Sequence, residues 1–185
     1  MKTLVHSGSL STKTPISFAD GSTIYKAFSK KYRLHKKGLF ILAPSGVGKT
    51  YFIKQQKTSE WMDGDALWEA TNAHPKGSWW LEPLETITEI DQRSDIVTAQ
   101  AKKLGFWMMG ASNAWLKPDA VVLPDWKTHQ KYIITREQTN YDGGATSKSF
   151  AQVQNHRKWM RRWAKQGVPI FTSIQEAVDA LTQTH

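Results

Sequence analysis

The residues best suited to chemistry in this sequence lie at positions 43–50, in the run APSGVGKT. Its two glycines allow a loop to turn backbone N–H groups inward, where they can surround the oxygens of a phosphate. Lys49 adds a positive charge that can reach phosphate oxygens, and the hydroxyl of Thr50 can bind Mg²⁺. The segment therefore predicts a nucleotide-binding site. Its predicted phosphate-binding residues are Ser45, Gly46, Val47, Gly48, Lys49 and Thr50.

The segments on either side of this loop support the prediction. Residues 38–43 are a continuous apolar run, as expected of a parallel strand that is buried on both faces. Residues 50–56 are compatible with a helix, whose N-terminus would point its partial positive charge at the same anion. The run matches the Walker A pattern, except that Ala43 replaces the first glycine, before the tight part of the loop.

Two carboxylates follow this loop after a short interval. Asp63 comes thirteen residues after Thr50, and Asp65 is two positions further on. We expect residues 59–63 to form a second strand beside the first, which would place both acids near the γ-phosphate. A hydroxyl acceptor benefits from a carboxylate that takes its proton, whereas a phosphate acceptor needs only cations. The pair therefore favours phosphoryl transfer to a hydroxyl; the alternative is a turn with an N-cap aspartate.

The run APSGVGKT followed closely by WMDGD resembles small P-loop kinases of the adenylate kinase-like group. It is nearest to gluconate, adenylylsulfate and shikimate kinases and, more distantly, to polynucleotide kinases. The resemblance covers residues 38–70; beyond them only the order of elements is similar. It implies ATP and Mg²⁺ as cofactors and a catalytic role for Lys49. It further implies that Thr50 and Asp63 bind the metal and that Asp65 faces the acceptor, or that the two acids exchange roles.

One departure from other P-loop enzymes concerns the strand expected at residues 106–111. It ends without the acid of a Walker B motif, so Asp63 would have to replace that acid, or Mg²⁺ would be held through water. This difference argues against motor-type ATPases and fits small kinases.

The resemblance also implies a lid over the phosphates, at about residues 128–160. Four of the six arginines fall in or just after this region, and two adjacent glycines in residues 139–147 would form the mobile tip. Arg136 and Arg157 are the arginines expected to neutralise charge on the transferring phosphoryl group. Arg161 and Arg162 are further lid candidates. The alternative is an amphipathic helix whose arginines face water.

Residues 71–83 show no regular pattern, and the corresponding region of small kinases holds the acceptor. His74, Trp79 and Trp80 are therefore candidate acceptor contacts. The two tryptophans could clamp a base by stacking, or they could be core residues.

Charge is divided into blocks along the chain. The net charge is +9, with +7 over residues 1–37, −7 over residues 58–100 and +7 over residues 126–166. Basic blocks around an acidic one favour a polyanionic partner. With nine tryptophans available to stack on bases, this favours an acceptor hydroxyl on a nucleoside, nucleotide or nucleic acid. The small size and N-terminal extension also resemble virus-encoded kinases, including phage kinases that phosphorylate hydroxymethylated pyrimidines in DNA.

Two other functions remain open at this point. A nucleoside monophosphate kinase would need arginines that bind the acceptor phosphate, but residues 51–100 contain only Arg93. A non-catalytic, nucleotide-switched module would bind nucleic acid through the basic residues 26–37 and 157–165.

Alternation of strands and helices predicts an α/β protein with a P-loop NTPase fold. Its five-stranded parallel sheet would have helices on both faces. We expect strands at residues 38–43, 59–63, 106–111, 120–123 and 168–172, and helices at residues 50–56, 84–103, 126–136, 148–165 and 174–181.

Residues 38–185 would form the kinase domain, and residues 1–37 an extension with a β-hairpin at residues 15–28 and a basic linker. Because there are no cysteines, we expect no disulfide and no cysteine-ligated zinc. The N-terminal residues do not resemble a signal peptide, and no apolar run reaches membrane length. These features predict a cytoplasmic location, in a virus-infected cell or otherwise, and no membrane association.

Overall fold

The computed structural model describes residues 21, 24–75, 77–139 and 144–183, and its centre is a parallel sheet. The strands are β1 (Leu39–Leu42), β2 (Trp61–Asp63), β3 (Trp107–Gly110), β4 (Ala120–Val122) and β5 (Ile170–Phe171). They lie in the order β2-β3-β1-β4-β5, and every pairing is parallel. The predicted α/β architecture with a five-stranded parallel sheet is therefore confirmed, and it is compatible with a P-loop fold.

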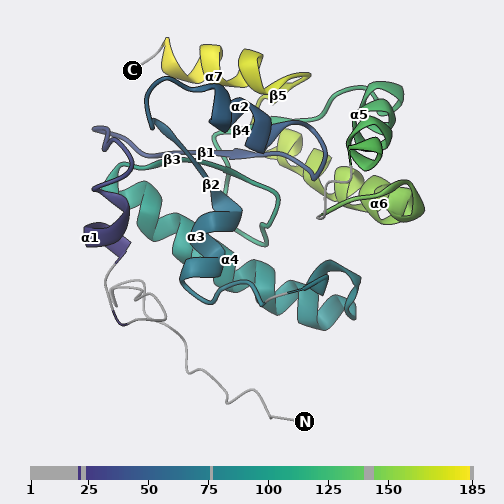
Figure 1. Ribbon diagram of the computed structural model, residues 1–185, viewed down its shortest axis with the longest axis horizontal. Helices are drawn as coiled ribbons and strands as arrows, with labels where there is room; N and C mark the ends of the chain where they lie inside the picture. The colour runs from purple at the N-terminus through teal and green to yellow at the C-terminus, as the bar shows by residue number, and fades with distance from the viewer. Residues whose placement is uncertain (1–20, 22–23, 76, 140–143, 184–185) are drawn as a thin grey trace.

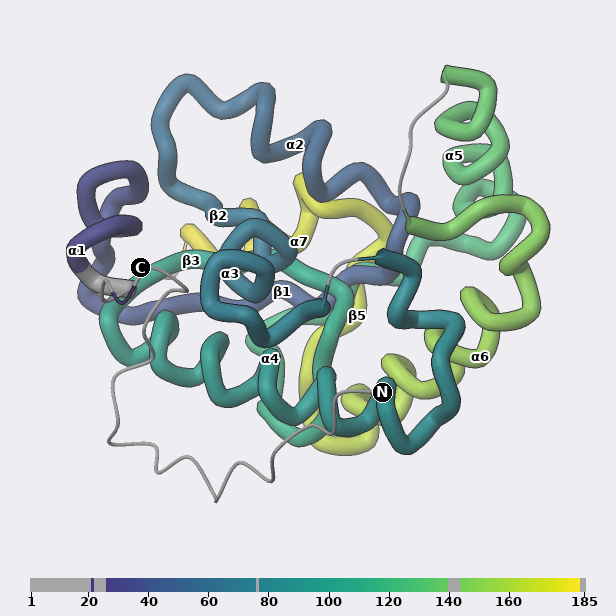
Figure 2. Tube along the Cα trace, turned by 60° about the horizontal axis from the view of Figure 1, so that its bottom comes forward, coloured from purple at the N-terminus to yellow at the C-terminus, as the bar shows by residue number. Residues whose placement is uncertain are grey.

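Helices cover both faces of this sheet (Figure 1). They are α1 (Ile24–Phe28), α2 (Lys49–Gln55), α3 (Gly64–Ala70), α4 (Leu84–Leu104), α5 (Trp126–Gln138), α6 (Phe150–Arg161) and α7 (Ile174–Thr182). Short 3₁₀ turns complete the elements: η1 (Trp79–Leu81), η2 (Ser147–Ser149) and η3 (Arg162–Gln166). Figure 2 shows α5 and α6 at the opposite end of the molecule from α1.

The core is divided by the sheet because successive side chains of a strand point to opposite faces. Phe40 and Leu42 of β1 pack with residues of α3, α4 and α6, whereas Leu39 and Ile41 pack with residues of α2 and α7. All four side chains are fully buried. The apolar run in β1 is thus the sequence of a strand enclosed on both sides, as predicted.

The place of β2 in the sheet differs from the prediction. β2 pairs with β3, and β3 lies between it and β1. All four residues of β1 and of β3 are buried, whereas the three-residue β2 ends at the half-buried Asp63. The fully buried strands therefore occupy the interior of the sheet, and β2, which ends at the half-buried Asp63, occupies an edge.

The N-terminal hairpin prediction is wrong in its second strand. Ile24–Phe28 form helix α1, and the amide of Tyr32 donates to the carbonyl of Phe28 as in a helical turn. The rings of Phe28 and Tyr32 stack at 5.7 Å, and Tyr32 is buried in the core. Apolar residues spaced four apart favour a helix over a strand. The first expected strand, residues 15–20, lies outside the described residues.

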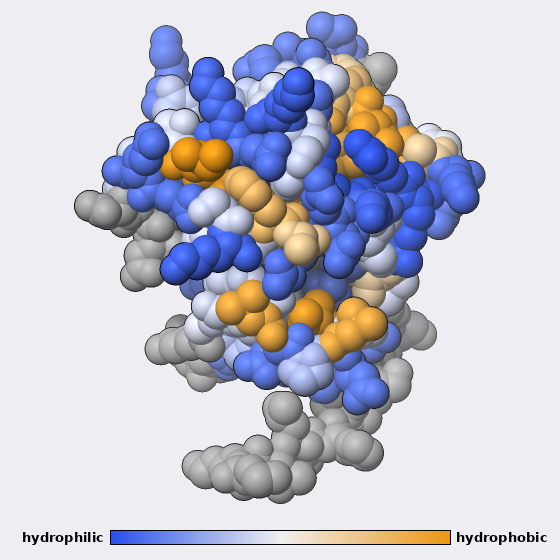
Figure 3. All heavy atoms as spheres, turned by 90° about the vertical axis from the view of Figure 1, so that its right-hand side faces the viewer, coloured by the Kyte–Doolittle hydropathy of each residue, from blue (hydrophilic) through white to orange (hydrophobic). Residues whose placement is uncertain are grey.

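The surface on the side of α5 and α6 is mostly hydrophilic, with hydrophobic residues in separate small groups (Figure 3). Over the part of the chain that the structure describes, no helix combines the length and the apolar character that a membrane crossing requires.

Candidate active site

Residues 43–50, which we call the glycine loop, connect β1 to α2 and enclose an open space. Gly46 (φ 90°) and Gly48 (φ 94°) both have left-handed backbone conformations. A side chain at position 48 would meet no atom within 4 Å, so glycine is needed there for its backbone alone. A Cβ at position 46 would also lie 2.6 Å from a side-chain carbon of Ile133 in α5. The loop is thus fixed by its own backbone and by α5.

Lys49 is folded back across the glycine loop and is only 7% exposed. Its Nζ donates hydrogen bonds to the carbonyls of Ala43 (3.0 Å) and Pro44 (3.1 Å). Burial lowers the pKa of the ammonium, and the nearby carboxylates of Asp65 and Asp63 partly offset this effect. The structure therefore holds a buried cation on two neutral oxygens, which are weaker partners for it than the oxygens of an anion.

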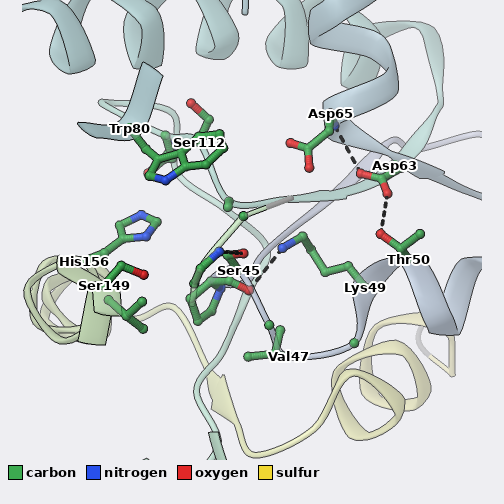
Figure 4. Close-up of a pocket in the computed structure, with 18 of the residues that line it drawn as sticks. Ser45, Val47, Lys49, Thr50, Asp63, Asp65, Trp80, Ser112, Ser149 and His156 are labelled. Carbon is green, nitrogen blue, oxygen red and sulfur yellow. Dashed lines mark hydrogen bonds between the residues drawn. The ribbon is translucent and has the colours of Figure 1, made fainter. Parts of the chain in front are cut away.

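Asp63 brings the end of β2 to the start of α2. Its Oδ2 accepts a hydrogen bond from Thr50 Oγ1 at 3.0 Å, and its Oδ1 accepts one from the amide of Asp65 at 3.1 Å (Figure 4). The second bond makes Asp63 the N-cap of α3, a helix that the sequence did not predict. The N-cap interpretation is therefore correct. The cap uses only Oδ1, so Oδ2 and the Thr50 hydroxyl lie side by side. Oxygen ligands of this kind suit Mg²⁺.

Asp65 lies opposite Lys49 and directs its carboxylate into the cavity (Figure 4). The residue remains accessible to solvent, but it lines the cavity, where the surrounding protein replaces part of its hydration. Burial raises the pKa of the carboxyl, and the charge of Lys49 lowers it less strongly. The two acids thus have separate surroundings. Asp63 is tied to Thr50 and α3, and Asp65 faces the space where an acceptor would lie.

The cavity continues from the glycine loop to a region rich in aromatic side chains. All three predicted acceptor residues, His74, Trp79 and Trp80, line it. Other residues that line this region were not predicted: Asp91, Ser112, Trp115, His156 and Trp159. Trp80, Ser112 and His156 lie together across the cavity from Thr50 and Asp63 (Figure 4). This part of the cavity therefore combines flat aromatic surfaces with a few polar groups.

His74 supports this wall from behind. It is buried, and its ring lies 4.7 Å from the ring of Trp68 and 4.5 Å from that of Trp79. Its Nε2 lies 2.9 Å from Ser94 Oγ, whose own proton goes to the carbonyl of Ile90. Nε2 is therefore the protonated nitrogen. Burial lowers the pKa of His74 to about 3, so the ring is neutral and its contacts are those of a packing residue.

Asp91 and Ser112 are in contact near the end of β3, the strand that lacks the acid of a Walker B motif. Ser112 follows the strand, and its hydroxyl donates to Asp91 Oδ1 of α4 in a short hydrogen bond. Burial raises the pKa of the Asp91 carboxyl to about 7. Asp91 was missed because nothing in the sequence of a long helix distinguishes one acidic residue that turns inward.

Loop residues 113–116 after β3 are held by one buried carboxylate. Asp95 of α4 accepts hydrogen bonds from the amides of Ala114 (2.9 Å), Trp115 (2.5 Å) and Leu116 (2.8 Å). Its other oxygen accepts one from the Asn113 side chain at 2.9 Å. Asp95 therefore has a structural role, which is to position Trp115 at the cavity.

The segment after residue 143 packs directly on the glycine loop. The amide of Ala145 donates to Ser45 Oγ at 3.0 Å, and Arg136 donates to the Ala145 carbonyl. A Cβ on Gly144 would lie 2.4 Å from the same Ser45 hydroxyl. Arg136 lines the cavity, and its charge acts on Lys49, so the structure brings this predicted lid arginine to the site.

The other predicted arginines are placed differently. Arg162 lines the cavity, where its guanidinium lies 3.8 Å over the ring of Trp159. Arg161 is exposed on the surface of α6. Arg157 is 3% exposed and does not line the cavity; it donates to His129 Nδ1 (2.8 Å) and to the carbonyl of Pro124 (2.5 Å). A direct contact of Arg157 with a phosphoryl group is therefore not compatible with this arrangement.

The described site thus gathers Lys49, Thr50, Asp63 and Asp65 around one opening, with Arg136 above it and aromatic residues beyond. The arrangement can bind an anion and a divalent cation, and it offers one further carboxylate. Neither a model of a known protein family nor a curated protein sequence matches the chain.

Proposed function

We propose that the protein is a kinase that transfers the γ-phosphate of ATP, with Mg²⁺, to a hydroxyl group. The observation that carries the proposal is that two carboxylates beside the glycine loop make different contacts. Asp63 Oδ2 is paired with the Thr50 hydroxyl, whereas Asp65 faces the cavity opposite Lys49. Phosphoryl transfer to a hydroxyl needs one group that holds Mg²⁺ and another that accepts the proton of the hydroxyl.

On the nucleotide side, Lys49 would exchange its two carbonyl partners for oxygens of the β- and γ-phosphates. Its low exposure makes this exchange favourable, because a buried ammonium gains more from an anion than from neutral oxygens. Thr50 and Asp63 would hold Mg²⁺, which when bound neutralises charge on the phosphates. Arg136, which also lines the cavity, would add a second positive charge.

On the acceptor side, Asp65 would take the proton of the attacking hydroxyl. The acceptor oxygen then forms a bond to the γ-phosphorus, the bond from that phosphorus to the bridging oxygen breaks, and ADP leaves with the electron pair. A carboxyl whose pKa is raised by burial is a stronger base than an ordinary aspartate. In this arrangement Asp65 and Lys49 act on opposite ends of the same transfer.

The aromatic lining favours a nucleoside, nucleotide or nucleic acid as the acceptor. Trp80, Trp115 and Trp159 all line the cavity, and any of the bases can stack on such aromatic faces. A hydroxymethylated pyrimidine in DNA, the acceptor of some phage kinases, combines a base with a reactive hydroxyl and is the specific candidate that we favour.

The proposal is tested by incubating the protein with ATP labelled at the γ-phosphate and Mg²⁺. The acceptors are nucleosides, nucleoside monophosphates, small sugars, and DNA with and without hydroxymethylated pyrimidines. Label on a hydroxyl that is lost in the Lys49→Ala variant supports the proposal. Label on a monophosphate identifies the alternative kinase, which the presence of Arg162 in the cavity favours. Label only in free phosphate, or in no product, contradicts the proposal and points to a nucleotide-switched nucleic-acid-binding module.

A further inference from the structure

His129 is a fully buried residue of α5 that joins the glycine loop to α6. Its Nε2 lies 2.8 Å from the carbonyl oxygen of Ser45, and its Nδ1 lies 2.8 Å from Nη1 of Arg157. A guanidinium has only donors, so Nδ1 must be the nitrogen that accepts. The proton of the neutral ring is therefore on Nε2, which donates to the carbonyl of Ser45. Arg157 thus selects the one tautomer that can hold the loop.

Arg157 is itself held in place. Its second terminal nitrogen donates to the carbonyl of Pro124 at 2.5 Å, and its guanidinium lies 5.5 Å over the ring of Trp126. Pro124 follows β4, so the contacts run from the sheet through α6 and α5 to the glycine loop. Because each group is buried and hydrogen-bonded, we expect little freedom in this chain of contacts.

The carbonyl that His129 binds belongs to the peptide unit that also contains the amide of Gly46. In a planar trans peptide the C=O and N–H bonds point in opposite directions. Fixing the carbonyl on the α5 side therefore turns the Gly46 N–H away from α5. Ile133, one turn further along α5, lies so close to Gly46 that a Cβ there would be 2.6 Å from its side chain, which leaves little space on the α5 side of the loop.

We propose that His129, held in one tautomer by Arg157, is a positioning residue that turns the Gly46 N–H toward the phosphates of the nucleotide. This inference deepens the proposed function and rests on it only in that the glycine loop binds phosphate. It also assigns a role to Arg157, which acts on the loop through His129 and does not contact the phosphoryl group. Helices α5 and α6 then help to determine nucleotide affinity and do more than cover the site.

The test compares His129→Gln, which keeps a side-chain donor, with His129→Leu, which has none. Ile134→Ala, an exposed position on α5, is the matched control. The affinity for MgADP is measured by calorimetry and the melting temperature by thermal unfolding, so that no catalysis is required. We expect His129→Leu to weaken MgADP binding by about tenfold, the effect of roughly one hydrogen bond, and His129→Gln and Ile134→Ala to stay within about threefold of the parent protein.

The NMR chemical shift of the Gly46 amide is a second measurement, which a general loss of stability would not change. It should shift on addition of MgADP in the parent protein and in His129→Gln, and much less in His129→Leu. Arg157→Met should weaken MgADP binding to an intermediate degree, because His129 can then adopt either tautomer. Arg157→Lys keeps a donor for Nδ1 and should bind MgADP more tightly than Arg157→Met. If His129→Leu does not fold, this pair supplies the same contrast.

Unchanged MgADP affinity and an unchanged Gly46 shift in His129→Leu would overturn the inference. An equal loss of MgADP affinity in His129→Gln and His129→Leu, at equal melting temperatures, would also overturn it. The side-chain donor at position 129 would then have no effect on binding. Failure of the proposed function looks different. The parent protein would bind MgADP, with the contrast between variants intact, but would transfer phosphate to no acceptor.

Discussion

Thr50 Oγ1 and Asp63 Oδ2 are 3.0 Å apart, although they belong to elements on either side of an intervening strand. Thr50 begins α2 after β1, Asp63 ends β2, and β3 separates the two strands. The contact therefore forms above the carboxyl ends of the strands, where ligands bind in open parallel α/β sheets. It joins the start of α2 to the end of β2.

Asp63→Asn should lower metal affinity while leaving the fold intact. Asparagine is as good an N-cap as aspartate, so α3 keeps its cap, but the negative charge beside Thr50 is lost. We expect the Mg²⁺ concentration for half-maximal activity to rise by at least about tenfold and the melting temperature to stay unchanged. Asp63→Ala is the comparison, since it should also cost about 1 kcal/mol of stability through the lost cap. An unchanged Mg²⁺ dependence in Asp63→Asn would exclude Asp63 from the metal site.

Lys49→Ala should abolish transfer. The substitution removes the charge expected to bridge the β- and γ-phosphates, and loss of one such group typically lowers turnover by about 10²–10³-fold. Of the two carbonyls that Lys49 binds, that of Pro44 belongs to a residue that lines the cavity, where water can replace the ammonium. Turnover is measured with labelled ATP and folding by circular dichroism. Near-normal turnover by a folded variant would contradict the kinase proposal.

Asp65→Asn should reduce turnover by about 10²–10⁴-fold, the usual contribution of a general base, with little effect on ATP binding. The base works only when ionised, so activity should fall as the pH decreases through its pKa. Because burial raises that pKa, the acid limb of the profile should lie above the ordinary range of an aspartate. The variant should lack this limb. Should Asp65→Asn weaken ATP binding and leave turnover unchanged, Asp65 belongs to the nucleotide side.

The sequence predicted the glycine loop and the five strands because these features are local. Gly46 and Gly48 supply the left-handed backbone conformations that the loop needs, and the apolar run of β1 shows its burial on both faces. The order of β2 and β3 was not predictable in the same way, since it depends on how fully each strand is buried in the folded sheet.

The buried and half-buried polar residues of the site could not be predicted from the sequence. His129, Asp91 and Asp95 each lie on a helix, where burial depends on packing against segments that are distant in the chain. For Arg157, by contrast, a contact was predicted that the structure does not contain. Its position in the lid region suggested a phosphate contact, but α6 turns it inward, where it binds His129 and the carbonyl of Pro124.

Asp91→Asn should make the protein more stable at neutral and basic pH. In the folded state the Asp91 pKa is about 7, compared with about 3.9 for an unfolded aspartate, so the folded state binds more protons between these values. The contribution of this carboxyl to stability is therefore complete below about pH 4 and is lost as the pH rises toward 7. The neutral amide has no such dependence, and Ser112 can redirect its hydroxyl proton to Ser94 Oγ, 3.2 Å away.

The measurement for Asp91 is the free energy of unfolding of both proteins by urea, at several pH values between 4 and 8. The advantage of Asp91→Asn should be near zero at pH 4 and should grow with pH, by at most about 1.4 kcal/mol per unit within this window. Ser112→Ala is a useful comparison, because it removes the hydrogen bond that lowers the Asp91 pKa. It should therefore move the upper end of the window to higher pH. A difference between the parent protein and Asp91→Asn that does not change with pH would show that Asp91 is ionised in the folded protein throughout this range.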